Sequence, residues 1–431
     1  MYISEIELRD VRRFDKQKIK INRHGGSVVI AGDNGAGKTT ILRSIAMGLC
    51  DVTSAAGLLR ELPGSFVRTG ESAATIDIEL EDRKTRRYRT FTTIKRQKPF
   101  EQIEQDLSQK NGRWEKRKQD KFPWKQIFVC GYGAGRHASG TADYDKYRAV
   151  DAVYTLFRYY EPLQNPELTL RRIMDEAWLR SGPKSGLKEE TRVGEHLLQL
   201  VRRILNIKDR LKLRGSGIRV KRPRGDTDIR SSGDGYSAMA TLVLDLINWY
   251  MQAVGPNRIL HIINRGMRRR VSDRSLEASG IVLIDEIEQH LHPVWQIQIM
   301  HLLTSTFPKL QFIVTTHSPL VQSGCAGLQL VNLAPQQPEA RSESPSVYGW
   351  IAEDVYRNMG LASTRAIKIQ NLLDDFKELH LKSLLGKLSP RGRAKMREIT
   401  DQFNGIPGMD VTLTSSKLRN IGSLPSGRKK G

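Results

Sequence analysis

The spacing of apolar residues divides the first part of the chain into segments with strand periodicity. Apolar and polar residues alternate over residues 2–8 and 18–21, which predicts two strands with one buried face. Residues 27–31 are almost all apolar and predict a strand that is buried on both faces. Residues 74–80 and 87–95 alternate again on either side of a charged turn, so we expect an antiparallel pair.

The middle of the chain changes character. Residues 97–123 are polar and charged with little apolar periodicity, so we expect a surface excursion before residues 127–130 return to a buried strand. From about Tyr147 to Asn206 apolar residues recur at helical spacing, without the sustained heptads of a long coiled coil. A basic segment at 208–224 precedes a long helix, which is predicted from about Ser237 to Ala253.

The last part again alternates buried strands with helices. Strands are predicted at residues 280–284, 312–314 and 328–333, and a helix begins at Val294. Beyond these elements we expect three further segments: a linker at 334–346, helices over 350–404, and a fraying tail rich in Gly, Pro, Ser and Lys over 405–431.

The net charge of the chain indicates a possible class of binding partner. The chain of 431 residues holds 70 Lys and Arg against 47 Asp and Glu, a net charge of +23, which favours a polyanion such as nucleic acid. Solubility is the alternative explanation. Three widely spaced cysteines show no metal-binding pattern and suggest a reducing cytoplasm. We expect no signal peptide and no membrane span, because the chain starts with a strand pattern and has no apolar run of 18 residues.

The strongest chemical signal is a phosphate-binding loop. Residues 32–39 fit the pattern G-x-x-x-x-G-K-[ST], between the strand at 27–31 and a helix-forming run. Glycines let the main-chain N–H groups point at phosphate oxygens, and the helix dipole adds positive potential. Lys38 is expected to reach the β- and γ-phosphates, and Thr39 to ligate Mg²⁺. The residues expected to bind ATP here are Asn34, Gly35, Ala36, Gly37, Lys38, Thr39 and Thr40.

Two further strand ends complete the expected site. The buried strand 281–284 runs into Asp285 and Glu286, and alternation places these two carboxylates on different sides of the strand end. We expect Asp285 to hold Mg²⁺ and Glu286 to polarise the attacking water. A second buried strand ends in a polar cluster with His317, which adjacent strands would bring near the γ-phosphate. A histidine at a strand end is also commonly a structural residue.

A loop of small residues at 231–237 opens the long helix. Its N–H groups and hydroxyls suit a second contact with phosphate, from Ser232, Gly233, Asp234 and Gly235. As an isolated turn this loop would carry no information. Its value lies in its position between the phosphate loop and the acidic strand end.

With these motifs in this order, the chain resembles the ABC-type ATPases of the SMC/RecF/OLD branch. Residues 32–39 resemble Walker A, residues 281–286 Walker B, residues 232–236 a divergent signature motif, residues 288–293 the D-loop, and His317 the switch histidine. The opening strands and the turn with Phe14 resemble the first lobe of the family. The resemblance covers about residues 1–50, 124–137 and 230–333, and it is nearest to compact Septu-like and OLD-like phage-defence ATPases.

The resemblance implies a head-to-head dimer that sandwiches two ATP molecules. Glu286, Lys38 and His317 would then be the catalytic residues, with Gly233 and Gly235 contacting ATP in the partner subunit. Two features depart from the family. The signature is not Leu-Ser-Gly-Gly-Gln, and Gln126 lies on the wrong side of its strand end to serve as a Q-loop glutamine, so we expect Arg136 or its neighbouring glycines to face the nucleotide.

The implied fold class is α/β: an ABC-type P-loop ATPase head with a mixed sheet, an antiparallel β lobe, a helical insertion and a C-terminal helical extension. The expected domains are residues 1–137 as the first part of the head with Walker A, 138–230 as a helical and basic insertion, 231–333 as the second part of the head, and 334–431 as linker, docking helices and tail. No OLD-type nuclease module or metal-ligand cluster follows residue 334, so we expect any nuclease or effector to be a separate subunit.

Two basic segments are candidate nucleic-acid contacts. Residues 83–98 and 208–224 are rich in Lys and Arg, and a groove formed by both would follow a phosphate backbone without reading bases. A solvated surface or a face for an acidic protein is the alternative. The predicted contacts are Arg83, Lys84, Arg86, Arg87, Arg89, Lys95, Arg96, Arg219, Lys221 and Arg222.

Three functions remain open on the sequence. The first is a DNA-associated ATPase in the cytoplasm that dimerises on ATP and controls a nuclease or effector in phage defence or DNA repair. The second is a scaffold that holds ATP with little turnover. The third, a transporter subunit, is disfavoured by the basic insertions and the signature. An apolar stripe in the C-terminal helices, from Ile367 to Leu381, suits docking of a partner as well as ordinary core packing.

Overall fold

The computed structural model forms two compact units, Met1–Gly360 and Leu361–Gly431, which are described separately. The residues it describes are 1–22, 25–81, 87–97, 99–109, 127–140, 147–158, 162–205, 207, 209–214, 217–222, 225–229, 234–254, 280–333 and 367–404. In these parts of the chain, no helix combines the length and the apolar character that crossing a bilayer requires.

A parallel sheet of five strands forms the centre of the first unit. Its order is β15 (Gln329–Leu333), β3 (Val28–Gly32), β14 (Leu310–Thr316), β13 (Gly280–Ile284) and β7 (Val129–Tyr132). The pairings between these strands are all parallel. The strands that the apolar runs predict are therefore confirmed, and they are apolar on both faces because both faces are covered.

Alternation along the central strands feeds two hydrophobic cores. In β3, Val29 and Ala31 belong to one core, whereas Val28 and Ile30 belong to the other. The first core also contains most of the long helices, and the second contains the antiparallel sheet. Since successive side chains of a strand point to opposite faces, one short apolar run anchors both halves of the unit.

The second sheet is antiparallel, in the order β2-β1-β4-β5-β6. Its strands are β1 (Tyr2–Val11), β2 (Phe14–Lys20), β4 (Ala73–Glu81), β5 (Arg87–Lys95) and β6 (Gln102–Gln109). The predicted pairing of β4 with β5 is confirmed. The prediction of a surface excursion beginning at residue 97 is wrong for β6, which pairs with β5 along its length. An edge strand with one covered face needs few apolar residues, so its polar sequence concealed it.

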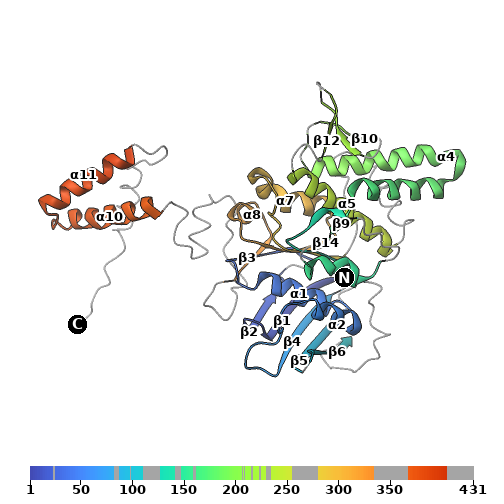
Figure 1. Ribbon diagram of the computed structural model, residues 1–431, viewed down its shortest axis with the longest axis horizontal. Coiled ribbons are helices and arrows are strands. Elements are labelled where there is room, and N and C mark those ends of the chain that lie inside the picture. Colours follow the sequence, from blue (N-terminus) through green and yellow to red (C-terminus); the bar gives the residue numbers. More distant parts are fainter. Residues whose placement is uncertain are drawn as a thin grey trace. The chain divides into compact units, whose positions relative to one another are not determined.

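Two helices lie beside this sheet. Helix α1 (Lys38–Gly48) lies between the antiparallel and the central sheets (Figure 1). Gly48 allows the close approach, because a Cβ at this position would lie 2.6 Å from the Cδ1 atom of Ile78. Helix α2 (Val52–Arg60) follows, and Asp51 caps it by accepting hydrogen bonds from the N–H groups of Thr53 and Ser54.

The helical insertion covers both sides of the central sheet. Helix α4 (Pro166–Ile204), which kinks at Gly182 (φ 69°), packs in the core opposite α1, whereas α3 (Ala149–Val153) and the 3₁₀ helix η3 (Tyr154–Leu156) bury Val153 and Leu156 in the same core as α1. The predicted helical region is confirmed in the main. It is interrupted by a short strand β9 (Pro162–Gln164), which pairs in parallel with β8 (His137–Gly140).

Helix α5 (Asp234–Val254) begins three residues earlier than predicted and packs against α4. The basic segment before it forms a small sheet of β10 (Leu211–Arg214), β11 (Gly217–Val220) and β12 (Thr227–Asp228). Helices α7 (Pro293–Thr306) and α8 (Pro319–Ser323) connect the central strands. The first unit thus has a mixed α/β architecture, with a parallel central sheet, an antiparallel sheet and a helical insertion, as the sequence predicts.

The second unit contains a pair of helices, α10 (Ile367–Leu384) and α11 (Pro390–Asn404), which contact each other. Phe376 of α10 and Ile399 of α11 are buried, and the ammonium group of Lys395 lies 2.7 Å from the carboxylate of Asp375. Leu381 and Leu385 are exposed. The predicted helices are thus present over 367–404, whereas the predicted linker at 334–346 and the tail at 405–431 lie outside the described residues.

Candidate nucleotide-binding site

The sheet order brings three motif-bearing strand ends to one edge. Strand β14 lies between β3 and β13, and all three are parallel. The phosphate loop after β3, the acidic pair after β13 and the polar cluster after β14 therefore meet at the carboxyl edge of the sheet. Ligands of open parallel sheets bind outside this edge.

The phosphate loop has the backbone that its glycines allow. Gly35 and Gly37 have φ values of 77° and 94°, which other residues rarely adopt. Gly37 precedes α1 as its N-cap, and no side chain hydrogen-bonds to this helix end. The N–H groups at the start of α1 can therefore serve an anion. Ala36 and Thr40 are buried in this loop and the first helical turn.

The loop also contacts the segment around Phe14, which the sequence assigned to the first lobe without a role at this site. The ring of Phe14 packs so closely that a Cβ at Gly37 would lie 2.4 Å from it, and the guanidinium of Arg13 donates a hydrogen bond to the carbonyl of Gly35. Arg13 lies in the tight turn between β1 and β2, and Phe14 is the first residue of β2. The sequence signal for this contact was the pair of basic residues before Phe14, which were not assigned a role.

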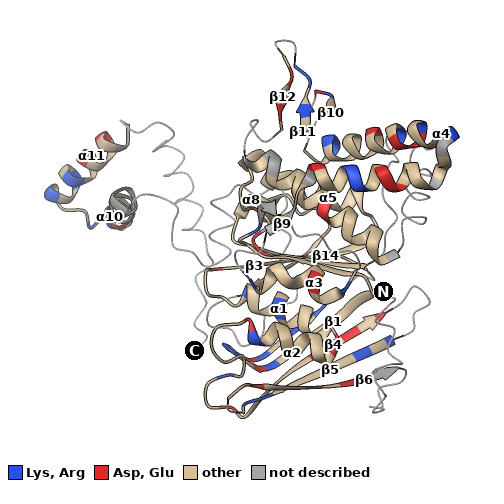
Figure 2. Ribbon diagram, turned by 45° about the vertical axis from the view of Figure 1, so that its right-hand side comes forward, with Lys and Arg blue, Asp and Glu red and all other residues tan. Residues whose placement is uncertain are grey.

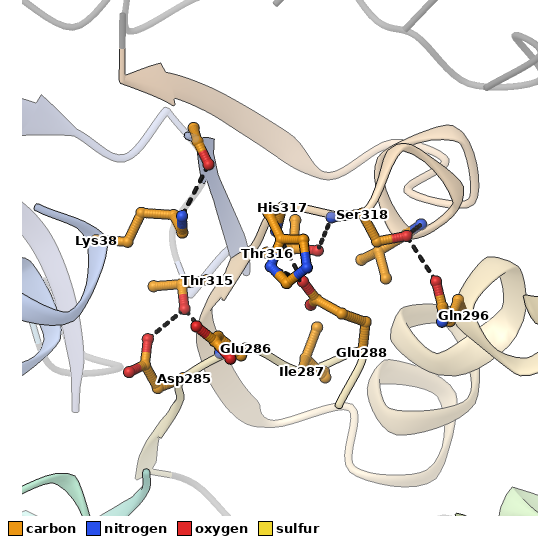
Figure 3. Close-up of polar contacts among 12 residues, drawn as sticks. Lys38, Asp285, Glu286, Ile287, Glu288, Gln296, Thr315, Thr316, His317 and Ser318 are labelled. Atoms are coloured by element: carbon orange, nitrogen blue, oxygen red, sulfur yellow. Dashed lines mark hydrogen bonds and ion pairs between the residues drawn. The ribbon is translucent and has the colours of Figure 1, made fainter. Parts of the chain in front are cut away.

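Lys38 folds back over its own loop. Its ammonium group donates to the carbonyl oxygens of Gly32 at 2.7 Å and Asp33 at 2.9 Å (Figure 3). Burial lowers the pKa of Lys38, and the nearby carboxylates, led by Asp285 and Glu286, oppose that shift. Lys38 is only 6% exposed. A phosphate that contacts its ammonium group would therefore be largely removed from water, which strengthens their electrostatic attraction.

Asp285 links the two halves of the site through hydroxyl groups. One carboxylate oxygen, Oδ2, accepts a hydrogen bond of 2.7 Å from the hydroxyl of Thr39, and Oδ1 accepts one of 2.5 Å from Thr315. The predicted metal ligands Thr39 and Asp285 are therefore in direct contact. Their hard oxygen atoms fit Mg²⁺, which proteins commonly bind with few side chains plus substrate phosphates. In the described part of the chain, no cluster of three His, Cys, Asp or Glu residues suits a metal.

Glu286 has an unusual main chain. Its φ is 46°, in the left-handed region that non-glycine residues seldom occupy, and its N–H donates to the Thr315 hydroxyl at 2.9 Å. Such a conformation costs on the order of 1–3 kcal/mol and is most common at functional sites. Thr315 therefore fixes both carboxylate residues, Asp285 through its side chain and Glu286 through its main chain. Sequence reasoning did not assign a role to this threonine.

Arg136 hydrogen-bonds to the main chain of residues 285–287, which we call the acidic turn. Its guanidinium donates to the carbonyls of Gly133 (3.1 Å), Asp285 (2.7 Å), Glu286 (3.0 Å) and Ile287 (3.4 Å). Burial lowers the pKa of Arg136 to about 10, so the group remains charged at neutral pH. Main-chain carbonyls thus occupy both terminal nitrogens of Arg136, and the expectation that Arg136 or its neighbouring glycines face the nucleotide stays a prediction. Gln126 lies outside the described residues.

His317 lies at the same edge and contacts a residue that the sequence had not singled out. Its main-chain N–H and its ring Nδ1 both lie 2.8 Å from Oε1 of Glu288. The next residue, Ser318, donates its hydroxyl hydrogen bond to Gln296 of α7 (Figure 3). The signal for Glu288 was an acidic residue two positions after Glu286, inside the segment assigned to the D-loop.

The signature region is described only in part. Ser232 and Gly233 lie outside the described residues, while Asp234 and Gly235 open α5. A Cβ at Gly235 would lie 2.4 Å from the carbonyl oxygen of His290, which itself has a φ of 65°. The first turn of α5 therefore packs against the segment that follows Glu286. This contact explains a glycine at this position independently of any ligand.

The predicted nucleic-acid contacts fall into two separate groups. In the antiparallel sheet, Arg87 pairs with Glu81, Arg89 with Asp77 and Lys95 with Glu104, and Arg96 donates to main-chain carbonyls. Arg83, Lys84 and Arg86 lie outside the described residues.

The second group belongs to the β10–β12 sheet and its flank. Arg219 and Lys221 lie here, and Arg222 is 4.0 Å from the carboxylate of Asp209. Figures 1 and 2 place the β10–β12 sheet and the antiparallel sheet at opposite ends of the first unit. The two basic groups thus do not form one groove on a single chain.

Comparison with known families and sequences points to P-loop proteins. An AAA domain family matches residues 5–128. A second AAA domain family, whose description names the AbiEii toxin and a type IV TA system, matches residues 267–323.

Two of the matched relatives are longer than this chain. The Septu protein PtuA of Bacillus mycoides (strain KBAB4) is 24% identical over 431 residues, which cover 97% of this chain and 52% of that protein. The Retron Ec83 probable ATPase of Escherichia coli is 40% identical over 107 residues, or 24% of this chain and 19% of the relative. The chain thus spans about half the length of the PtuA relative.

A solved structure with a related arrangement is the SMC head domain from Thermotoga maritima. It aligns with 79% of this chain and 97% of its own, at 14% identity and a TM-score of 0.43.

Proposed function

We propose, from the premise that this chain is an ABC-type ATPase of the SMC/RecF branch, that it hydrolyses ATP in an ATP-bridged dimer and thereby controls a separate effector in anti-phage defence. The observation that carries the proposal is the hydroxyl network around Asp285. Thr39 of Walker A and Thr315 of β14 both donate to this carboxylate, and Thr315 also accepts from the N–H of Glu286. Phosphate-binding and water-activating residues are thereby held in one rigid arrangement.

Each residue has a chemical role in this proposal. Thr39 and Asp285 would hold Mg²⁺, which neutralises charge on the phosphates when it is bound. Lys38 turns from its own loop carbonyls toward the β- and γ-phosphates. Glu286 accepts a hydrogen bond from the water that attacks in line, and His317 contacts the terminal phosphate from the end of β14.

A dimer supplies what one chain lacks. The start of α5 presents helix N–H groups, and the contact of Gly235 with His290 ties this helix to the segment that follows Glu286. If α5 of one subunit binds the γ-phosphate held by its partner, each ATP joins two chains. Hydrolysis then separates the two chains, so the rate of hydrolysis sets how long the dimer persists.

The effector is proposed from the relatives. Septu-like systems are phage-defence systems, and the chain is similar to a Septu PtuA over almost its whole length. We place the effector, a nuclease in the simplest case, on the α10–α11 pair, whose exposed Leu381 and Leu385 suit a protein contact. The net charge of +23 supports DNA as a further ligand, and we place the protein in the cytoplasm.

The test is the ATPase rate of the purified chain, with and without duplex DNA, at two salt concentrations. Glu286→Gln is the control, because it retains the binding groups and loses water activation. We expect turnover in the wild type, stimulation by DNA that falls at higher salt, and a stable ATP-bound dimer of Glu286→Gln by light scattering.

Two results would contradict parts of this proposal. A Glu286→Gln protein that stays monomeric with saturating ATP would exclude the sandwich. Tight ATP binding with no turnover above the Glu286→Gln rate would instead favour a scaffold that is assembled on ATP. Lys38→Ala separates these cases from a folding defect, because it should abolish ATP binding without changing the far-UV circular dichroism.

A further inference from the structure

Glu288 is a buried carboxylate that the roles assigned above leave unused. It is 6% exposed, and its Oε1 atom lies 2.8 Å from both the main-chain nitrogen and the ring Nδ1 of His317. Its second oxygen, Oε2, is buried and has no hydrogen-bond partner within the described residues. The hydrogen bonding of this side chain is therefore concentrated on one residue, 29 positions away in sequence.

The two contacts at Oε1 determine where the ring proton lies. The main-chain N–H of His317 can only donate, so Oε1 accepts there. For the second contact at 2.8 Å to be a hydrogen bond, a proton must lie between Oε1 and Nδ1. An oxygen that already accepts from the main chain in this geometry is suited to accept again, so the structure assigns this proton to Nδ1.

This assignment decides which ring atom can meet a ligand. With Nδ1 bound to Glu288, only Nε2 is left for another partner. The side chain of His317 is half exposed, and in Figure 3 its ring lies between Glu288 on one side and Lys38, Asp285 and Glu286 on the other. Nε2 is therefore the ring atom available to the phosphate side of the site.

We propose that Glu288 is a positioning residue that holds the Nδ1–H of His317, and that Nε2 takes a second proton from solvent when ATP binds, so that Nε2–H donates a hydrogen bond to the terminal phosphate. Two negative groups then flank one imidazolium, Glu288 at Nδ1 and the phosphate at Nε2. The arrangement has the logic of a carboxylate that orients a catalytic histidine through its far nitrogen. Glu286 remains the residue that contacts the attacking water. This inference rests on the proposed ATPase function for its kinetic test, but not for its spectroscopic one.

The kinetic test is a double-mutant cycle of Glu288→Ala and His317→Ala, with Glu288→Gln as the isosteric variant. We expect Glu288→Ala to lower kcat by about 30- to 100-fold, as loss of an orienting partner or a phosphate donor does, with the ATP Kd changed by less than about 3-fold. Glu288→Gln can still accept both hydrogen bonds but has no charge, and should lose about 10-fold in kcat. The double variant should be no slower than His317→Ala, because the two residues act as a unit.

A matched control is Glu5→Ala. Glu5 pairs with Lys18 in the antiparallel sheet at 2.6 Å, so its loss removes a carboxylate contact without touching the site. Its kcat should equal that of the wild type. A Glu288→Ala variant within 3-fold of wild-type kcat, or single effects that multiply in the double variant, would overturn the inference.

The spectroscopic test does not depend on turnover. Nitrogen-15 NMR of the histidine rings distinguishes protonated from unprotonated Nδ1 and Nε2, and the His317→Ala spectrum identifies the His317 signals. With ATP and Mg²⁺ bound to the Glu286→Gln protein, we expect both nitrogens of His317 to be protonated, and Nδ1 to lose its proton or its hydrogen-bond shift in Glu288→Ala. An unprotonated Nδ1, or signals that ATP and the Glu288 variant leave unchanged, would overturn the proposal. If the protein shows no ATPase activity but gives the expected spectrum, the proposed function is refuted and the inference about Glu288 stands.

Discussion

The edge of the central sheet and the antiparallel sheet hold their charged residues in different ways. In the antiparallel sheet, Arg89 pairs with Asp77 and Lys18 with Glu5, diagonally across neighbouring strands and partly in solvent. At the site edge, Lys38 and Arg136 are buried, and their hydrogen bonds go to main-chain carbonyls. In the first arrangement a carboxylate is the hydrogen-bond partner of each cation, and in the second the partners are neutral carbonyl groups.

The difference separates stability from function. An exposed ion pair contributes about 0–1 kcal/mol and leaves little field for a ligand. A buried cation held by neutral dipoles costs desolvation free energy, but it presents its charge to whatever anion enters. The two regions therefore predict different outcomes for equivalent substitutions.

The largest effect is expected at Arg136. Arg136→Ala leaves the carbonyls of Gly133, Asp285 and Glu286 without their buried donor, so the free energy of unfolding should fall by about 3–4 kcal/mol. Urea denaturation measures this loss. Lys95→Ala is the counterpart in the antiparallel sheet and should cost no more than about 1 kcal/mol, since Lys95 and its partner Glu104 are both exposed. Equal losses at both positions would remove the distinction.

The next effect tests the hydroxyl of Thr315. Thr315→Val removes one donor to Asp285 and one acceptor for Glu286, so we expect a loss of about 2 kcal/mol in unfolding free energy and Mg²⁺-dependent ATP binding weaker by about 10- to 100-fold. Thr315→Ser should retain most of both. Calorimetric titration with and without Mg²⁺ measures the binding.

A matched threonine sharpens this test. Thr90 of the antiparallel sheet is also fully buried, but its Oγ1 has no hydrogen-bond partner among the described residues. Thr90→Val should therefore be neutral or slightly stabilising. If it destabilised the protein as much as Thr315→Val, the effect at Thr315 would reflect the loss of a β-branched hydroxyl in general.

The third effect concerns the contact between α5 and the segment after Glu286. Gly235→Ala places a methyl group 2.4 Å from the His290 carbonyl, so one element must move, at a cost of about 1–2 kcal/mol. Gly57→Ala in α2 meets nothing within 4 Å and should instead stabilise the protein by up to about 1 kcal/mol. Thermal unfolding compares the two, and a shift of the same sign in both would contradict the packing argument.

The smallest effects on stability, below about 1 kcal/mol, are expected for the basic surface residues. Here DNA binding is the informative measurement. Neutralising Arg219 and Lys221 with Gln should flatten the dependence of log Kd on log salt by about one unit per lost phosphate contact. Neutralising Arg87 and Arg89 should change it less, since acidic partners already occupy these side chains. The reverse order would place DNA on the antiparallel sheet.

Prediction from the sequence succeeded where the residues that determine a local structure all lie in one contiguous segment. The phosphate loop, its glycines and the helix after it lie within residues 32–48, so the motif specified the backbone of this segment. The apolar runs that became β3, β13 and β14 were confirmed for the same reason, because burial on both faces is visible in each run alone. The strand β6 was missed because an edge strand shows little of that signal.

The sequence by itself therefore determined that this chain has a phosphate loop, two carboxylates at a strand end and a histidine at another. The tertiary structure decided what these groups contact. The pairing of Glu288 with His317, the support of the acidic turn by Arg136 and the neutralisation of Arg89 by Asp77 all join residues from different elements. Strand order and register bring them together, and hydrogen bonds and Coulomb interactions act through space over a few ångströms. A pattern along the chain records the residue types but not these distances.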